Sequence, residues 1–151
     1  MTEAERISIE RACERLVTLF HIYADRFDHD ALLGLYADDA VVDHIYVGKI
    51  EGREAIKSYL ARKETTSITR HITTNIVIDV IDESHAKGKS YWTFYASAPG
   101  STPPVLLKGP MAVGDYDDEF VRTKDGWRFS YRRSSGIFGA PHASDYVLFK
   151  A

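Results

Sequence analysis

His71 is the side chain in this sequence whose type and setting best suit proton transfer. It lies within an Ile- and Thr-rich stretch, Arg70-His71-Ile72-Thr73-Thr74-Asn75, which we predict to be a β-strand. An imidazole titrates near neutral pH and is an effective general base when a buried carboxylate holds its other nitrogen. Strand alternation places Thr73, Asn75 and Val77 on the same face as His71. This face is either a solvated edge or the polar lining of a cavity.

Other polar side chains are candidates for contacts with a substrate. Asp28 follows the apolar positions of a predicted long helix, where a carboxylate usually caps the next helix or is solvated. His44 and Tyr46 share one face of a predicted strand, and Tyr23 precedes Asp28 on the helix. These groups are of the types that orient or polarise a substrate oxygen, although each is also compatible with a structural role.

Arg132 and Arg133 are adjacent near the end of the last predicted strand. Neighbouring residues of a strand face opposite sides, so at most one of them faces a cavity. A buried arginine requires a carboxylate or a substrate anion to compensate its charge. The alternative is that both are surface charges.

Motifs for several other chemistries are absent from the sequence. The six histidines show no H-E-x-x-H spacing, and the chain has no G-x-G-x-x-G, G-x-x-x-x-G-K-[ST] or G-x-S-x-G motif. Cys13 is the single cysteine and is expected to be a buried, inert thiol. We therefore expect neither a cofactor nor a metal ion.

Length and composition limit the class of protein. The chain has 151 residues and 17.1 kDa, which favours one domain over residues 1–151. Nineteen Lys and Arg residues against 22 Asp and Glu residues give a net charge of −3, which argues against nucleic acid or an anionic membrane as the main partner. The sequence has no run of about 18 apolar residues and its start, MTEAERISIE, lacks a signal-peptide pattern, so we expect a cytoplasmic protein. Aromatic residues make up 12% and could fill a core or line a pocket for a flat ligand.

The order of the predicted elements indicates an α+β fold. Thr2 and Glu5 form a capping-box pattern, and apolar residues then recur at helical spacing at Ile9, Ala12, Leu16, Leu19, Tyr23 and Phe27. The remaining expected elements are a short helix around 32–36, a strand over 41–47, a helix over 53–64, and strands over 68–81, 87–98, 105–121 and 127–133. Helices followed by antiparallel strands favour helices packed on one face of a curved sheet, which leaves a cavity at its open end.

Five short segments give the chain a resemblance to a known family. They are Tyr23-Ala24-Asp25-Arg26-Phe27-Asp28, Leu32-Leu33-Gly34-Leu35-Tyr36-Ala37-Asp38-Asp39-Ala40, Gly52-Arg53-Glu54-Ala55-Ile56, Arg70-His71-Ile72-Thr73-Thr74-Asn75 and Asp125-Gly126-Trp127-Arg128-Phe129. In this order they resemble the SnoaL-like branch of the nuclear transport factor 2-like superfamily. Within it, the chain is most similar to scytalone dehydratase and hexachlorocyclohexane dehydrochlorinase. The resemblance implies a cone-shaped, strongly bent antiparallel sheet closed by helices around a pocket.

The resemblance also implies a site. It places the aspartate of a catalytic Asp–His dyad on Asp28 and the histidine on His71, a pocket residue on His44, and the dehydrochlorinase arginine on Arg132. The chain differs from these enzymes at other positions. Phe27 and His44 stand where the dehydratase has tyrosines, Tyr23 stands where the dehydrochlorinase has lysine, and residues 91–96 contain no second histidine. Scytalone itself is therefore not the expected substrate.

Together these observations predict a cofactor-independent lyase for a small cyclic or aromatic hydroxylated compound. Dehydration, dehydrohalogenation and retro-aldol cleavage all begin with the proton transfer that such a dyad supports. Tyr23, His44 or Arg132 would stabilise the developing oxyanion or assist the leaving group. Aromatic residues would enclose the ring, namely Tyr46, Trp92, Phe94 and Phe138. The apolar tail over 137–149 would close over the pocket.

Two other classes of function remain open. The first is an isomerase or cyclase on the same fold, and the second is a non-catalytic small-molecule-binding or assembly module, since a fold does not fix a function. An assembly module has no need for Asp28 and His71 to meet in an enclosed pocket, so the distance between these two side chains discriminates the classes. A homodimer or homotrimer is expected, because the family's exposed sheet faces are usually covered by self-association.

Overall fold

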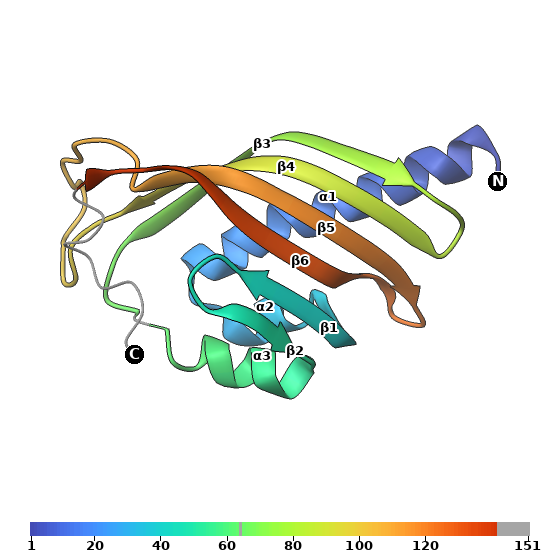
Figure 1. The fold of residues 1–151 in the computed structure, drawn as a ribbon, viewed down its shortest axis with the longest axis horizontal. Coiled ribbons are helices and arrows are strands. Elements are labelled where there is room, and N and C mark those ends of the chain that lie inside the picture. Colours follow the sequence, from blue (N-terminus) through green and yellow to red (C-terminus); the bar gives the residue numbers. More distant parts are fainter. Residues whose placement is uncertain (64, 142–151) are drawn as a thin grey trace.

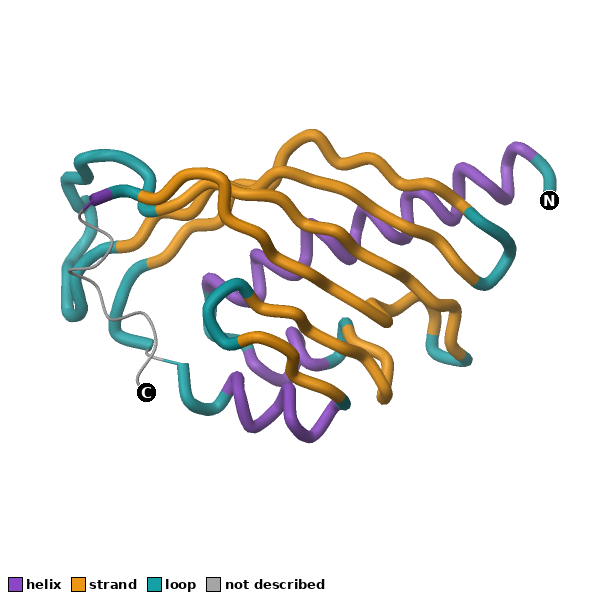
Figure 2. The backbone as a smooth tube through the Cα atoms, in the orientation of Figure 1, coloured by secondary structure: helices purple, strands orange, loops and turns teal. Residues whose placement is uncertain are grey.

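The computed structural model describes residues 1–63 and 65–141. Its elements are α1 (Glu3–Asp25), α2 (His29–Leu33), β1 (Tyr36–His44), β2 (Gly48–Glu51), α3 (Arg53–Leu60), β3 (Thr69–Val80), β4 (His85–Ala96), β5 (Ala112–Thr123) and β6 (Gly126–Gly139). The strands form one curved sheet in the order β2-β1-β6-β5-β4-β3, and all neighbours are antiparallel except β1 and β6. Helix α1 runs along one face of the sheet, and α2 and α3 lie near β1 and β2 (Figures 1 and 2). The predicted α+β fold is confirmed.

The first helix begins as predicted but buries a different stripe. The Thr2 side chain accepts from the Glu5 backbone, and the Glu5 side chain accepts from the Thr2 backbone, which completes the capping box. The buried residues are Ile9, Cys13, Leu16, Val17 and His21. The stripe therefore continues through a cysteine and a histidine, whereas the prediction followed Ala12, Leu19 and Tyr23, which are only partly buried.

Several other predicted boundaries shift, and β2 was not predicted. The second helix ends at Leu33, and Leu35 and Tyr36 are buried at the start of β1 rather than on a helix. Strand β1 ends at His44, so Tyr46 lies in the turn that leads to β2. The core forms between the three helices and the sheet and is closed by aromatic packing, with the Phe120 and Phe129 rings 5.1 Å apart.

Two irregularities decide which side chains point toward the helices. In β3, Asn75 has φ 53°, and the pairing with β4 shifts between Thr74 and Val77. Beyond this bulge, Ile78 is buried and Val77 is exposed, so Val77 does not share the face of His71 as predicted. In β6, Ser130 is an extra residue between Phe129, which pairs with Phe120, and Tyr131, which pairs with Glu119. Strict alternation would turn Arg132 away from Phe129, but the bulge places both on the inner face.

Within residues 1–63 and 65–141, no helix is both long and apolar enough to span a membrane.

Candidate active site

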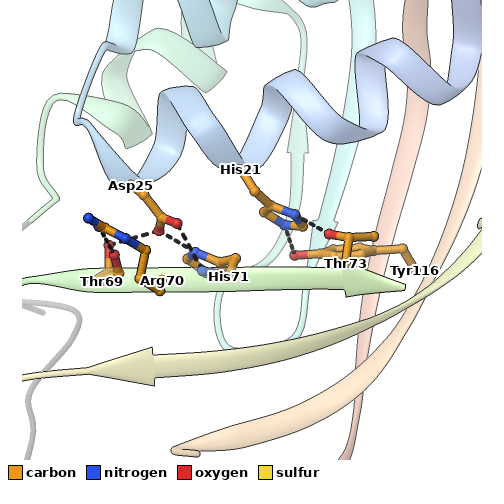
Figure 3. Close-up of polar contacts among 7 residues, drawn as sticks. All are labelled: His21, Asp25, Thr69, Arg70, His71, Thr73 and Tyr116. Carbon is orange, nitrogen blue, oxygen red and sulfur yellow. Dashed lines mark hydrogen bonds and ion pairs between the residues drawn. The ribbon is translucent and has the colours of Figure 1, made fainter. Parts of the chain in front are cut away.

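Asp25 and His71 form a doubly bonded polar pair between α1 and the sheet (Figure 3). The His71 ring Nδ1 lies 2.7 Å from Asp25 Oδ1, and the His71 backbone N–H donates to Asp25 Oδ2 at 2.9 Å. The Thr69 hydroxyl also donates to Asp25 Oδ1 at 2.9 Å. Asp25 is the last residue of α1, and Thr69 and His71 face it from the start of β3. Three donors thus fix one carboxylate at the junction of helix and sheet.

The predicted pairing of Asp28 with His71 is wrong. After α1 ends at Asp25, Phe27 adopts φ 55° and the chain turns. Asp28 then serves as the N-cap of α2, where its Oδ1 accepts from the Ala31 N–H at 3.1 Å. Its side chain is exposed. The capping role open to Asp28 from its residue type is the one that it has.

The hydrogen bonds define the protonation of the pair. Burial acts to raise the pKa of Asp25, but the bonds from His71 and Thr69 outweigh it and hold this pKa below its ordinary value. Burial lowers the pKa of His71, and the opposing effect of Asp25 does not restore it. At neutral pH the carboxylate is therefore ionised and the imidazole neutral. Because a carboxylate only accepts, the His71 proton is on Nδ1 and the basic lone pair is on Nε2.

His21, one helical turn before Asp25, forms a second layer behind His71. The two imidazole rings are stacked, with centroids 4.8 Å apart and planes 3° apart. His21 is only 4% exposed; its Nδ1 contacts the Thr73 hydroxyl and its Nε2 lies 3.3 Å from the Tyr116 hydroxyl. Burial, followed by the charges of His71, Arg132 and Lys63, lowers the pKa of His21 well below its usual value. A neutral His21 therefore contacts the Tyr116 hydroxyl through Nε2, and its ring stacks on the imidazole of His71.

A pocket lies beside this pair, with about 550 Å³ of space unoccupied by protein, including its open mouth. Its polar lining comprises His44, Tyr59, Lys63, His71, Tyr116, Arg132 and Ser134, and its apolar and remaining aromatic lining comprises Phe20, Ala24, Tyr36, Val42, Ile56 and Leu60. A mostly apolar cleft with a few convergent polar groups is the usual form of a small-molecule site.

Arg132 is the buried cation of this pocket. It is 2% exposed, and its guanidinium carbon lies 3.8 Å from the Tyr116 ring centroid and 4.1 Å from that of Phe20. Its Nη1 lies 3.4 Å from Asp118 Oδ2, directly across the strand pair, yet none of its nitrogens makes a hydrogen bond within the described residues. Burial raises the pKa of Asp118 to about 6, against the lowering effect of Arg132. Arg133, in contrast, pairs with Asp117 at 2.8 Å on the other face. Arg132 thus lines the pocket with a guanidinium enclosed by aromatic rings, and its donors have no hydrogen-bond partner among the described residues.

The other predicted site residues divide into two groups. His44 lines the pocket, and burial lowers its pKa to about 4. Tyr23, Tyr46, Trp92 and Phe138 are not among the lining residues of this pocket. Tyr23 packs on the core, Tyr46 and Phe138 are 63% and 69% exposed, and buried Trp92 donates its indole N–H to the Asp115 carbonyl at 3.1 Å. Phe94, also predicted to enclose the ligand, lies with its ring centroid 4.5 Å from that of His71.

Two further predictions concern closure of the pocket and metal binding. The expected closure by residues 137–149 falls largely outside it. Within it, no group of three or more His, Cys, Asp or Glu side chains is arranged to hold a metal ion.

Sequence reasoning missed Asp25, His21, Lys63 and Tyr116. A signal for the first two was present, because the series Ile9, Cys13, Val17, His21 and Asp25 advances by four residues along α1. Because the prediction followed only apolar residues, it did not include His21 and Asp25, which are the polar end of this stripe. Lys63 and Tyr116 carried no comparable signal, because only the tertiary fold brings them to the pocket.

Comparisons with known proteins agree with this geometry. A helix-covered, open and curved sheet defines the cystatin-like class of fold, and an NTF2-like protein of this fold from Novosphingobium aromaticivorans matches with TM-score 0.69 and 18% identity over 92% of this chain and 88% of the other. The model of the SnoaL-like domain family matches residues 5–133. The chain belongs to this family, which confirms the resemblance seen in the sequence.

Two further solved structures are similar to the chain. One is a provisionally assigned scytalone dehydratase from N. aromaticivorans, with TM-score 0.76 and 22% identity over 92% of this chain and 91% of the other. The second is a type 3 hexachlorocyclohexane dehydrochlorinase from Novosphingobium barchaimii, with TM-score 0.74 and 18% identity over 93% and 94%. No curated protein matches the sequence. Identities this low show the shared fold alone.

Proposed function

We propose that the protein is a cofactor-independent lyase that acts on a small cyclic or aromatic hydroxylated compound, with Asp25 and His71 as its catalytic dyad. The observation that carries the proposal is the 2.7 Å contact between His71 Nδ1 and Asp25 Oδ1 at the wall of a mostly apolar pocket. A structural histidine has no need of a neutral, lone-pair-bearing nitrogen beside an open cavity. The names of the similar dehydratase and dehydrochlorinase structures support the same class of reaction.

In this mechanism His71 Nε2 removes a proton from a substrate carbon, and the C–H electron pair forms the new double bond. The carbon–oxygen bond to the neighbouring hydroxyl breaks, and the proton held by His71 passes to the departing oxygen, which leaves as water. Asp25 stabilises the transient imidazolium and keeps Nε2 in position. Arg132 donates to the oxygen on which negative charge develops, and its apolar surroundings strengthen this interaction.

The same residues support an isomerase, and one observation favours that alternative. The unused donors of Arg132 suit an enolate oxygen, which an isomerase generates without expelling a group. The two reactions differ in product mass, since elimination loses water or hydrogen halide and isomerisation loses nothing.

A turnover screen tests the proposal. The purified protein is incubated with hydroxylated and halogenated cyclic compounds, and products are followed by liquid chromatography and mass spectrometry. We expect elimination of water or hydrogen halide by the wild type and loss of this activity in His71→Ala. If wild type and His71→Ala convert every compound at the same rate, the dyad is not catalytic and a binding module replaces the enzyme.

We also propose that the protein is a homodimer or homotrimer that works in the cytoplasm. The outer face of β3 and β4 supports self-association, because it exposes three large apolar side chains, Ile72, Val77 and Tyr91.

A further inference from the structure

The charged residues of the pocket wall all have the same sign. Lys63 and Arg132 line it, and none of the described lining residues is Asp or Glu. Asp25 lies behind His71, and Asp118 lies beside Arg132, but neither belongs to the lining. A cavity with two cations and apolar walls attracts anions, because low-dielectric walls focus the positive potential.

Lys63 is the cation nearer the solvent. It follows the C-terminal end of α3, its side chain is half-buried, and its Nζ lies 5.2 Å from the centroid of the Tyr59 ring. Within residues 1–63 and 65–141, no carboxylate lies within ion-pair distance of Nζ. Among the described residues, Arg132 faces the anion Asp118, whereas the Lys63 ammonium contacts the Tyr59 ring.

We propose that the pocket takes substrates that carry a carboxylate, and that Lys63 is the residue that binds this carboxylate. The inference rests on the proposed function, in which Arg132 receives the reacting oxygen, and it deepens that function by naming the substrate class. The substrate then has its reacting carbon at His71 and its carboxylate at the outer part of the pocket. Tyr59, Leu60 and Ile56 supply apolar contacts for the ring between these groups.

The electrostatics of the pocket agree with this assignment. Burial lowers the pKa of Lys63 to about 8, against the raising effect of Asp25. After burial, the charge of Lys63 is among the causes that lower the pKa of His44 and His71, so its field reaches the base. A bound carboxylate would compensate this charge. Carboxylate binding should accordingly weaken as the pH rises through about 8 and Lys63 loses its proton.

Binding of a matched pair of probes tests the proposal without turnover. Benzoate and benzamide have similar shape and differ in charge, so their dissociation constants can be compared by isothermal titration calorimetry. We expect wild type to bind benzoate at least about tenfold more tightly than benzamide, which is the scale of one charge-assisted hydrogen bond. Lys63→Met should lose this preference, and Lys63→Arg should keep most of it. Lys57→Met, which removes an exposed lysine from the nearby helix α3, should leave it intact.

The outcomes separate this proposal from the catalytic one. If wild type shows no preference for benzoate, or if Lys63→Met retains the preference in a folded protein, the carboxylate site is refuted whatever the enzyme turns over. His71→Ala should still discriminate between the two probes. If discrimination depends on Lys63 while no compound is ever converted, the binding proposal holds and the lyase proposal fails.

Discussion

The Asp25 carboxylate holds His71 twice, by the ring Nδ1 at 2.7 Å and by the backbone N–H at 2.9 Å. The two contacts tie the last residue of α1 to β3, which is an edge strand of the sheet. Because the ring and its own peptide are fixed by one group, the orientation of the imidazole depends on Asp25 and on the helix end that carries it.

Asp25→Asn should therefore remove catalysis, whereas Asp28→Ala should not. The amide cannot stabilise an imidazolium and can donate to Nδ1, which favours the wrong tautomer, so kcat should fall by at least about 100-fold. Asp28→Ala loses only the α2 cap, which should cost about 1 kcal/mol of unfolding free energy with kcat essentially unchanged. Steady-state kinetics and urea unfolding of both variants check the contrast, and a larger loss of kcat in Asp28→Ala would reverse the assignment.

The pH dependence of kcat/KM should report the neutral form of His71. Burial places the pKa of His71 below its ordinary value of 6.5, and only the unprotonated ring accepts a proton. Activity should therefore rise with pH through a midpoint below 6.5 and level off near neutral pH, and it should fall again only where Lys63 loses its proton near pH 8. Asp25 raises this pKa, so Asp25→Asn should move the midpoint of its residual activity further toward acid. A midpoint above 6.5 in wild type would contradict a neutral base.

Arg132 and Asp118 should be strongly coupled in stability. Both side chains are almost fully buried, so Arg132→Met leaves a buried carboxylate without its cation, which typically costs about 3–5 kcal/mol. The double change Arg132→Met with Asp118→Asn should recover much of this loss, although activity should stay low in both variants. Denaturant unfolding of the four proteins completes the cycle. Additive losses in the double variant would mean that the two residues act independently.

Self-association should depend on the outer face of β3 and β4. Val77 is 57% exposed there, and Val77→Glu should convert the predicted dimer or trimer to monomer, because a buried interfacial carboxylate is costly. Ile22→Glu introduces the same type of change on α1 and serves as the control. Light scattering coupled to size-exclusion chromatography measures the mass. A monomeric wild type would show that this face is not an interface.

The sequence predicted the general fold well because its signals were local. Capping residues and the periodicities of helices and strands each act within a few positions of the chain. The exception to the expected antiparallel pairing is the parallel pair of β1 and β6. The family motifs that carried the resemblance are local as well.

The site was less predictable because it depends on two bulges and one helix end. Sequence alone did not decide between Arg132 and Arg133, since the extra residue at Ser130 changes the alternation of β6. The bulge at Asn75 likewise interrupts the alternation of β3, so Val77 does not lie on the face of His71 as predicted. Asp25 and Asp28 both lie near the C-terminal end of the first helix, and only the turn at Phe27 shows which of them faces β3.

The protonation state of His71 is the most direct test of the whole account. Nitrogen-15 NMR of the imidazole at pH 7 distinguishes the two neutral tautomers and the imidazolium without any substrate. We predict a neutral ring with its proton on Nδ1, hydrogen-bonded to Asp25, and an unprotonated Nε2. A charged ring, or a neutral ring with the proton on Nε2, would contradict the proposal that His71 is the base of a lyase.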